Sequence, residues 1–402
     1  MVLLAEISIK KSKFIFDLIL QLADKYNTRI FLVGGPVRDL IMSKRKLPAV
    51  KQDLDIAVEN DHEKIGEDLA KELHARIIRY PQFMTMTLQL KNGSHIDIAR
   101  TRKEFYTRPA ILPIVYPASI KEDLKRRDFT INAMAMEIAK KTPYPVIDPH
   151  NGKRDLQDGL VRILHPQSFI DDPTRIFRAI RFATRFGFKI DAETITFMKK
   201  AIRANLLKLL SGERILYELK NIFEEEKSTE ILKVLQKYGV IKNIYGVKLQ
   251  PKFFSENRIL SADKKIPHFF SYIPEICWVK YPFTKESIKV AKTLKNFSRY
   301  RKKLARAKKP SEIYKVLIPL PILALEILSI LEQQSFKNKI RRHLAKYSKI
   351  KIFTSGKTLK EFKIPSGEMY SKVLKEVLYA KLDGRIKTKK QEVNYIKKLL
   401  NV

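Results

Sequence analysis

The pattern of apolar residues changes once along this chain, and that change restricts the fold more than any other feature. Up to about residue 138, short apolar runs typical of strands alternate with amphipathic segments typical of helices. From Asp171 almost to the end, apolar residues recur at helical spacing, with Pro and Gly between the segments. The sequence therefore predicts an α+β protein, in which a small mixed α/β head precedes a long helical part.

Within the head, we predict strands where apolar residues occupy every second position and helices where they recur every three to four positions. The stretch from Phe105 to Ser119 contains Pro109, Pro113 and Pro117, so we predict a loop there. The predicted strands are Arg29–Val33, Leu54–Val58, Met84–Leu90 and His95–Ala99, and the predicted helices are 12–26 and His62–His74.

The rest of the chain is predicted to be helical and to form several domains. The predicted helices are 172–186, 192–207, 212–225, 228–238, 284–306, 311–334, 336–347, 367–381 and 388–401. We expect a head over 1–138, a neck over 139–226, a helical body over 227–310 and a helical tail over 311–402.

The net charge of the chain limits the kinds of molecule that it is expected to bind. The 402 residues include 80 Lys and Arg against 43 Asp and Glu, a formal net charge of +37. Such an excess favours a polyanionic partner, first nucleic acid and second an anionic membrane surface, although a lysine-rich proteome would account for part of it. A single cysteine, Cys277, excludes an intrachain disulfide, and the first twenty residues and the later apolar windows fit neither a signal peptide nor a membrane span. We therefore expect a cytoplasmic protein that does not associate with a membrane.

The first candidate functional element is Gly34-Gly35-Pro36-Val37-Arg38-Asp39, which follows a predicted strand. Two glycines allow the backbone to approach a phosphate closely, and Arg38 could neutralise a phosphate oxygen. A Gly-Gly turn is also common for purely structural reasons, so this element alone indicates little.

The second element is Asp53-Leu54-Asp55, at the start of a predicted strand. Residues i and i+2 of a strand point to the same face, so both carboxylates converge on one spot. A divalent cation such as Mg²⁺ relieves their repulsion and takes oxygen ligands. The alternative is a solvated strand edge.

The third element is Arg126-Arg127-Asp128-Phe129-Thr130-Ile131-Asn132-Ala133-Met134. An Arg pair beside an Asp can bind a phosphate and ribose hydroxyls together. Alternatively, Asp128 caps a helix over Thr130–Met136.

These elements, in this order, resemble the class II tRNA nucleotidyltransferases and bacterial poly(A) polymerases, members of the polymerase β-like nucleotidyltransferase superfamily. The likeness is strong over residues 31–225 and weak in the tail. Further matching stretches are Asp148-Pro149, Gly152, Asp155-Leu156, Leu164-His165-Pro166, Ser168-Phe169, Asp171-Asp172-Pro173-Thr174-Arg175, Ile176–Phe182 and Gly212–Leu219.

The resemblance implies roles for particular residues. Asp53 and Asp55 would bind two Mg²⁺ ions, with Asp97 as a candidate third acid that is as readily an ordinary strand residue. Gly34, Gly35 and Arg38 would contact phosphates, while Arg127 and Asp128 would hold the ribose. Arg178 and Arg181 continue the arginine-rich helix and would contact phosphates or neighbouring acids, whereas Glu213, Arg214 and Glu218 fit a structural brace better.

Asp172 and Arg175 suggest how such a protein would choose a base. We predict both on the first turn of one helix, at i and i+3. A carboxylate accepts from an exocyclic amine and a guanidinium donates to a ring nitrogen, which selects cytosine and adenine over uracil and guanine. The family usually has Glu-Asp where this chain has Asp171-Asp172, which leaves the Asp/Arg pair intact. Alternatively, Asp172 is only an N-cap before Pro173.

The resemblance implies an Mg²⁺-dependent enzyme that adds nucleotides from CTP and ATP to the 3′ end of tRNA, with no obligate protein partner. The basic stretches Lys285–Lys309 and Lys337–Lys360 would grip the tRNA by shape and phosphates, although solvated helix faces explain many of these lysines. A poly(A) polymerase and a catalytically inactive tRNA-binding protein are the alternatives. Whether the enzyme adds CCA, only A or only CC stays open, although residues 100–123 look full-length.

Overall fold

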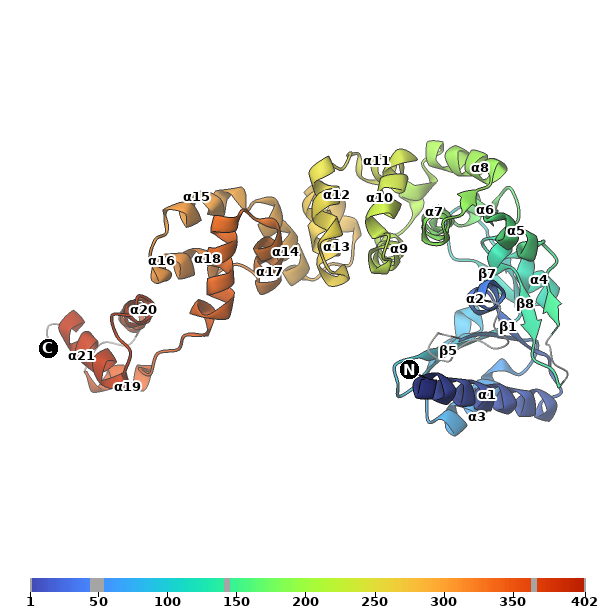
Figure 1. The fold of residues 1–402 in the computed structure, drawn as a ribbon, viewed down its shortest axis with the longest axis horizontal. Coiled ribbons are helices and arrows are strands. Elements are labelled where there is room, and N and C mark those ends of the chain that lie inside the picture. Colours follow the sequence, from blue (N-terminus) through green and yellow to red (C-terminus); the bar gives the residue numbers. More distant parts are fainter. Residues whose placement is uncertain (1, 44–53, 141–144, 363–366, 401–402) are drawn as a thin grey trace. The chain divides into compact units, whose positions relative to one another are not determined.

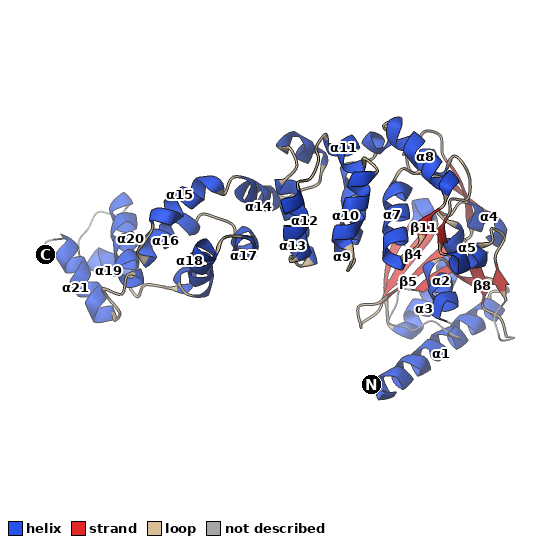
Figure 2. Ribbon diagram, turned by 45° about the horizontal axis from the view of Figure 1, so that its top comes forward, coloured by secondary structure: helices blue, strands red, loops and turns tan. Residues whose placement is uncertain are grey.

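The computed structural model describes residues 2–43, 54–140, 145–362 and 367–400, and it divides into two compact units (Figure 1). The first unit is Met1–Glu218 with Glu225–Gly246, and the second is Leu219–Glu224 with Val247–Val402. The first contains a mixed sheet, whereas every element in the described part of the second is helical (Figure 2). The predicted α+β class is therefore confirmed, and the finer division into four domains stays a prediction.

A seven-stranded sheet forms the centre of the first unit, in the order β3-β4-β5-β2-β1-β8-β9. Its central strands β2 and β5 run parallel, and the other neighbouring pairs are antiparallel. Two smaller sheets pair β6 with β7 and β10 with β11. The strands are β1 Ile30–Val33, β2 Leu54–Val58, β3 Arg76–Tyr80, β4 Thr85–Gln89, β5 His95–Arg100, β6 Arg102–Phe105, β7 Ile114–Pro117, β8 Ala135–Glu137, β9 Val146–Ile147, β10 Leu160–Val161 and β11 Lys189–Ile190.

The two faces of the large sheet have different roles because side chains alternate along each strand. One face packs against helix α3 (His62–Leu73), where a Cβ at Gly66 would lie 2.0 Å from Met86 Sδ and 3.4 Å from Ile98. On the other face, Ile120 and Leu124 of helix α4 (Ile120–Lys125) join a cluster that includes Ala57. Asp55 shares the face of Ala57, so it lies on the α4 side.

Helices surround the sheet and continue beyond it in the first unit. Helix α7 (Thr174–Phe186) buries one apolar stripe, including Ile176, Phe177 and Ile180, as its 3.6-residue period requires. The remaining helices are α1 Val2–Lys25, α2 Gly35–Ser43, η1 Pro81–Phe83, η2 Thr130–Asn132, α5 Gly152–Asp158, α6 Ser168–Asp171, α8 Ala192–Arg203, η3 Leu206–Leu209, α9 Gly212–Glu224, α10 Ser228–Lys237 and α11 Val240–Tyr245.

The second unit is held together by several apolar clusters rather than by one core. The largest includes Leu304, Leu317 and Ile340, and a separate cluster near the end includes Leu359, Val377 and Ile396. The helices are α12 Pro251–Arg258, α13 Ala262–Ser271, η4 Glu275–Lys280, α14 Lys285–Lys295, α15 Ser298–Arg306, α16 Pro310–Leu317, α17 Ile322–Leu331, α18 Gln334–Ala345, η5 Tyr347–Lys349, α19 Gly356–Glu361, α20 Glu368–Leu382 and α21 Lys389–Leu400.

Two predictions in the head are wrong. The stretch Phe105–Ser119 is not all loop, because β7 pairs with β6 in a two-stranded ribbon whose only proline, Pro117, lies at its end. The predicted helix over Thr130–Met136 is a short 3₁₀ turn followed by strand β8, which pairs with β1. Almost every side chain in this stretch is buried, so the sequence has no amphipathic period that would distinguish the two.

Two long helices predicted in the second unit are each broken. The segment 311–334 forms α16 and α17, because Pro319 and Pro321 cannot continue a helix. The segment 284–306 forms α14 and α15, and Asn296 between them donates its side-chain amide to the Lys292 carbonyl at 3.1 Å. Apolar spacing continues across both short turns, so periodicity alone does not detect them.

Among the described residues, no single helix has the length and apolar character needed to cross a membrane. Helices α16 and α17 reach that length and apolar character only when they are counted together, and the chain bends by 115° between them.

Candidate active site

A cavity of 530 Å³ opens in the first unit, beside the sheet face that carries Asp55. Its lining includes carboxylates and arginines, which come from the strands, from α2, from the turn after α4, and from α7 and α9. The predicted site residues among its lining are Gly34, Gly35, Arg38, Asp55, Arg127, Asp128, Asp172, Arg175 and Arg178. Asp53 lies outside the described residues.

Gly34 sits where no side chain fits. Its φ is +71°, a conformation that favours glycine, and a Cβ there would lie 2.9 Å from Arg127 Nη1 and 3.6 Å from Asp55 Oδ2. The bare backbone therefore passes between a carboxylate and a guanidinium, at the beginning of helix α2. This is the close approach that a phosphate group needs.

Asp55 and Asp97 lie side by side on the sheet. Strands β2 and β5 are parallel neighbours, and in their register Asp55 is paired with Asp97. Both side chains therefore point to the same face. Thr87 Oγ1, on β4, donates to Asp97 Oδ1 at 2.5 Å, which orients that carboxylate.

These carboxylates fit the chemistry of a hard divalent cation. Carboxylate oxygens are the protein ligands that Mg²⁺ takes, and Asp55 Oδ2 borders the glycine gap where a phosphate would approach. The described residues alone do not gather three acids at one point, and Asp53 is not among them. Nucleotidyltransferases of this fold use divalent metal ions, generally Mg²⁺.

Asp123, on α4, orients the arginine pair, and sequence reasoning did not identify it. Its Oδ1 accepts from Arg126 Nε and Nη2 at 3.0 and 2.8 Å, and its Oδ2 accepts from Arg127 Nη2 at 2.9 Å. Burial opposes ionisation of Asp123, but the two guanidinium groups outweigh it and hold the pKa of its carboxyl below its usual value. The spacing of i, i+3 and i+4 was the signal that could have indicated it.

Asp128 forms a second buried pair. Its Oδ2 accepts from Arg178 Nε and Nη2 at 2.8 and 2.6 Å, and its Oδ1 accepts from the Asn132 amide at 3.0 Å. Burial alone would raise the pKa of Asp128. The Arg178 guanidinium and the Asn132 amide outweigh this effect and hold the pKa below its usual value, so the carboxylate stays ionised. Asn132 Oδ1 in turn accepts from Arg38 Nη1 at 2.6 Å. The predicted phosphate ligand Arg38 is thus buried and held by an amide.

Asp172 and Arg175 both line the cavity, but their placement differs from the prediction. Helix α7 begins at Thr174, so Asp172 precedes the helix, and its Oδ1 accepts from the Thr174 backbone N–H at 2.9 Å. The capping role is therefore present. Arg175 is buried, and it donates to Ser168 Oγ at 2.6 Å and to the Arg126 carbonyl at 2.8 Å. The two side chains are therefore held by different partners.

Arg214, which the sequence suggested as a brace, links two walls of the cavity. It donates through Nη2 to Asp172 Oδ1 at 2.6 Å and through Nη1 to the Ala110 carbonyl at 2.6 Å. Ala110 belongs to the connection between β6 and β7, and its N–H donates to the Ile170 carbonyl at 3.3 Å. Arg214 is therefore both a brace and part of the cavity lining.

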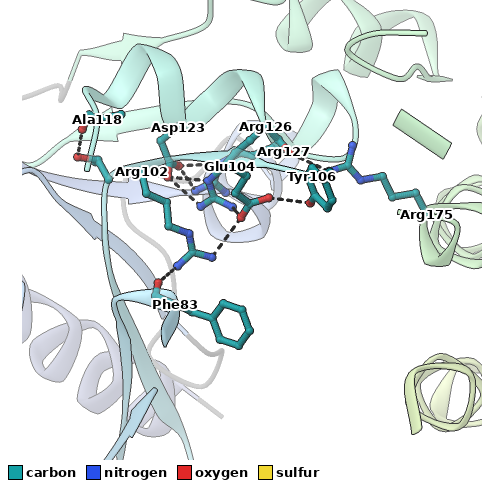
Figure 3. Close-up of polar contacts among 10 residues, drawn as sticks. Phe83, Arg102, Glu104, Tyr106, Ala118, Asp123, Arg126, Arg127 and Arg175 are labelled. Atoms are coloured by element: carbon teal, nitrogen blue, oxygen red, sulfur yellow. Dashed lines mark hydrogen bonds and ion pairs between the residues drawn. The ribbon is translucent and has the colours of Figure 1, made fainter. Parts of the chain in front are cut away.

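Glu104 and Tyr106 are two further cavity residues that sequence reasoning did not assign to the site. Glu104, on β6, accepts from Arg126 Nη1 at 2.7 Å and from the Tyr106 hydroxyl at 2.8 Å (Figure 3). Its neighbour Arg102 donates to the Phe83 carbonyl. Arg102 and Glu104 share one face of β6 and Tyr106 follows the last residue of that strand, so the Arg-x-Glu-x-Tyr spacing was the available signal.

Comparison with known proteins agrees with this geometry. The Poly A polymerase head domain model matches residues 30–162, and a model described as a probable RNA and SrmB-binding site of polymerase A matches residues 187–246. Along the chain, the head-domain match therefore precedes the RNA-binding match.

Two curated relatives and one solved structure are similar over most of the chain. The A-adding tRNA nucleotidyltransferase of Aquifex aeolicus is 32% identical over 354 residues, 81% of this chain and 41% of the relative. That of Halalkalibacterium halodurans is 28% identical over 393 residues, 95% of this chain and 91% of the relative. The Thermotoga maritima CCA-adding enzyme complexed with tRNA superposes with a TM-score of 0.70 at 27% identity, covering 96% of this chain and 94% of that chain.

The sheet, its neighbouring strand acids and the arginine-lined cavity define a nucleotidyltransferase head of the poly(A) polymerase type. The chain belongs to the class II tRNA nucleotidyltransferase family. It spans less than half the length of the Aquifex relative and of a similar relative from Geobacter sulfurreducens (41% and 45%).

Proposed function

We propose that this chain transfers nucleotides from ATP and CTP to the 3′ end of tRNA, and that AMP addition to a tRNA ending in CC is its main reaction. The observation that carries the proposal is one cavity that combines a strand carboxylate, Asp55, with arginines on facing elements. The carboxylate suits a metal ion, and the arginines suit a triphosphate. The preference for AMP follows the A-adding activity named for the relatives from Aquifex and Halalkalibacterium.

Asp53 and Asp55 would bind two Mg²⁺ ions as shared ligands, and Asp97 lies beside Asp55. Ions bound there would activate the RNA 3′-hydroxyl and stabilise the departing pyrophosphate. The protein contributes the position of the ligands. The β2–β5 register fixes Asp55 against Asp97, and the Thr87 hydroxyl holds Asp97 in one orientation.

The glycine turn and the arginine pair would hold the nucleotide. Gly34 leaves room for the triphosphate between Asp55 and Arg127, and Gly35 begins α2, whose N-terminal N–H groups favour an anion. Arg127 would neutralise phosphate oxygens, because Asp123 fixes its guanidinium through Nε and Nη2 and Nη1 faces Gly34. Asp128 would accept from the ribose hydroxyls.

Asp172 and Arg175 would choose the base. Three donors, from Thr174 and Arg214, converge on Asp172 Oδ1, so Oδ2 would accept from the exocyclic amine of adenine or cytosine. Arg175 uses two of its five N–H groups on Ser168 and Arg126, and a remaining one would donate to the ring nitrogen. Uracil and guanine would place a carbonyl against the Asp172 carboxylate, so they would be rejected.

The test uses the purified chain with Mg²⁺ and three tRNA transcripts, ending in CC, in C, or without CCA. ATP and CTP are supplied singly and together, and products are resolved at single-nucleotide length. Extension of the CC-ended transcript alone, by one residue from ATP, is the expected result. Completion of all three would make the chain a CCA-adding enzyme, and long adenylate tails would make it a poly(A) polymerase. Tight tRNA binding without extension of any transcript would contradict the enzyme proposal.

A further inference from the structure

The β6–β7 ribbon has two faces of opposite character. Register pairs Phe105 with Ile114, Glu104 with Val115, and Lys103 with Tyr116, so alternate pairs lie on opposite faces. Glu104 and Val115 are buried. On the other face, Phe105, Ile114 and Tyr116 are all exposed, and Lys103 Nζ lies 6.0 Å from the centre of the Tyr116 ring. We call this exposed set, with Leu112, the outer face of the ribbon.

The inner face explains why the outer face keeps a fixed position. Glu104 binds Arg126, the Thr101 hydroxyl donates to the Ala118 carbonyl at 2.5 Å, and the connection between the strands is held at Ala110 (Figure 3). The ribbon is therefore anchored through its inner side chains and its backbone. The exposed rings contribute little burial, so the packing of the ribbon does not explain why they are apolar.

The outer face begins at the rim of the cavity. Leu112 is exposed and also lines the cavity, together with Pro113 and the inner residue Tyr106. A ligand chain whose last unit lies in the cavity would pass over Leu112 and meet Phe105 or Tyr116 next. A patch of rings with one lysine, continuous with an anion-binding cavity on a chain of net charge +37, suits a single strand of nucleic acid.

We propose that the outer face of the ribbon is a stacking platform for the unpaired 3′-terminal nucleotides of the RNA acceptor. Phe105 and Tyr116 stack on bases, which any base permits, while Lys103 neutralises a phosphate between them. The platform delivers the 3′-hydroxyl to the cavity independently of the nucleotide bound there. This inference rests on the proposed function, because it specifies how the RNA substrate of that site is held.

The experiment measures binding without catalysis. An RNA hairpin carries 2-aminopurine in an unpaired 3′ overhang, and the full chain is titrated into it without nucleotides or metal ions. Stacking on a ring should quench the 2-aminopurine fluorescence. Phe105→Ser and Tyr116→Ser should each weaken binding of the overhang about five- to tenfold and reduce the quenching, whereas Tyr116→Phe should keep both.

The chain supplies a matched control. Phe14, on α1, is 57% exposed and Phe105 is 59% exposed, so Phe14→Ser removes an equally exposed ring elsewhere in the same unit and should bind as the unchanged protein does. All variants should bind equally well to an RNA hairpin that lacks the 3′ overhang. If Phe105→Ser and Tyr116→Ser bind the overhang normally, or if they abolish only self-association in sedimentation, the platform is rejected. If they lose overhang binding while no protein incorporates a nucleotide, the platform stands and the transferase proposal fails.

Discussion

Positive charge has different functions in the two units of this protein. In the first, arginines such as Arg38, Arg126 and Arg175 are shielded from solvent and held by carboxylates, amides or carbonyls around one cavity. In the second, Lys302 and Arg306 of α15 project into solvent. A guanidinium that the fold holds in place selects a ligand by geometry, whereas an exposed one adds attraction to any polyanion.

The second unit also buries a few charged groups, but they connect segments of chain. Glu392, on α21, is fully buried and accepts from the backbone N–H groups of Phe353 and Thr354 at 2.8 and 2.9 Å. Lys381 Nζ donates to its other oxygen at 2.8 Å. Burial alone therefore does not indicate a ligand site. A 270 Å³ cavity of the second unit is also lined by charged residues, among them Glu256, Arg301 and Glu332, so what distinguishes the first unit is the set of seven arginines that lines its larger cavity.

The sharpest test of the contrast is Asp55→Asn. Removing a metal-binding charge from the cavity should lower the rate of nucleotide incorporation by about a thousandfold or more, without lowering tRNA affinity. The measurement is single-turnover extension of a CC-ended transcript, with filter binding of the same tRNA. Asp68→Asn, which alters an acid paired with Lys25 on the same unit, should retain full activity. If Asp55→Asn and Asp68→Asn lowered the incorporation rate equally, charges in the cavity and charges on the surface would not differ in function.

Asp128→Asn tests whether the cavity charges also stabilise the first unit. The change leaves the partly exposed Arg178 guanidinium beside a neutral amide, which should cost about 2 kcal/mol of unfolding free energy. Urea denaturation at pH 7, followed by hydrogen exchange in α7, measures the loss. The pKa of Asp128 is depressed by its partners, so the stabilisation is complete above its unfolded pKa and disappears as the pH falls below about 4. A variant as stable as the parent at pH 7 would contradict this account.

The second unit should respond to acid in a different pH window. His343 is buried on α18, and burial lowers its pKa to about 4. The unfolded chain binds a proton near pH 6.5, so the second unit should lose about 2 kcal/mol as the pH falls from 6.5 to 4. Hydrogen exchange in α18 against α7 measures the difference. His343→Phe should abolish this loss, and unchanged pH dependence in the variant would point to another group.

Arg214→Lys probes a cavity arginine that acts through others. Lysine keeps the charge but cannot reach both the Asp172 carboxylate and the Ala110 carbonyl, so the base-selecting wall loosens. We expect about a tenfold loss in kcat/KM for ATP and a smaller preference over GTP. Competition between ATP and GTP on a CC-ended tRNA gives the ratio. A lower rate with unchanged base preference would assign Arg214 a purely structural role.

The smallest effects belong to the exposed charges. Lys302→Gln and Arg306→Gln should each weaken tRNA binding about two- to threefold at moderate salt, and each should lower the slope of log affinity against log salt by about one. Fluorescence anisotropy with a salt titration measures both quantities. Their effects should add when the variants are combined. A loss in one variant as large as that of a cavity arginine would show that the second unit also contains a shaped site.

The sequence predicted the parts of the site that lie close together in the chain. Strand β2 has the predicted bounds, and the cavity gathers nine of the predicted residues. The contact between Arg214 and Asp172 joins residues 42 apart, and the pairing of Asp55 with Asp97 depends on a register that no local pattern specifies. Glu104 was missed because strand β6 was not predicted, since its partner β7 lies in the proline-containing stretch that was predicted to be a loop.

The wide spread of the cavity along the chain has a consequence for synthesis. The lining residues run from Gly34 to Arg214, and the chain is made from its N-terminus. The acidic wall is translated first, and the arginine that closes the base-selecting wall emerges about 160 residues later. A ribosome-bound chain that stops before α9 would present its strand acids to solvent without the means to discriminate bases. The contacts that we propose to select the base would therefore form late, once α9 has left the ribosome and docked.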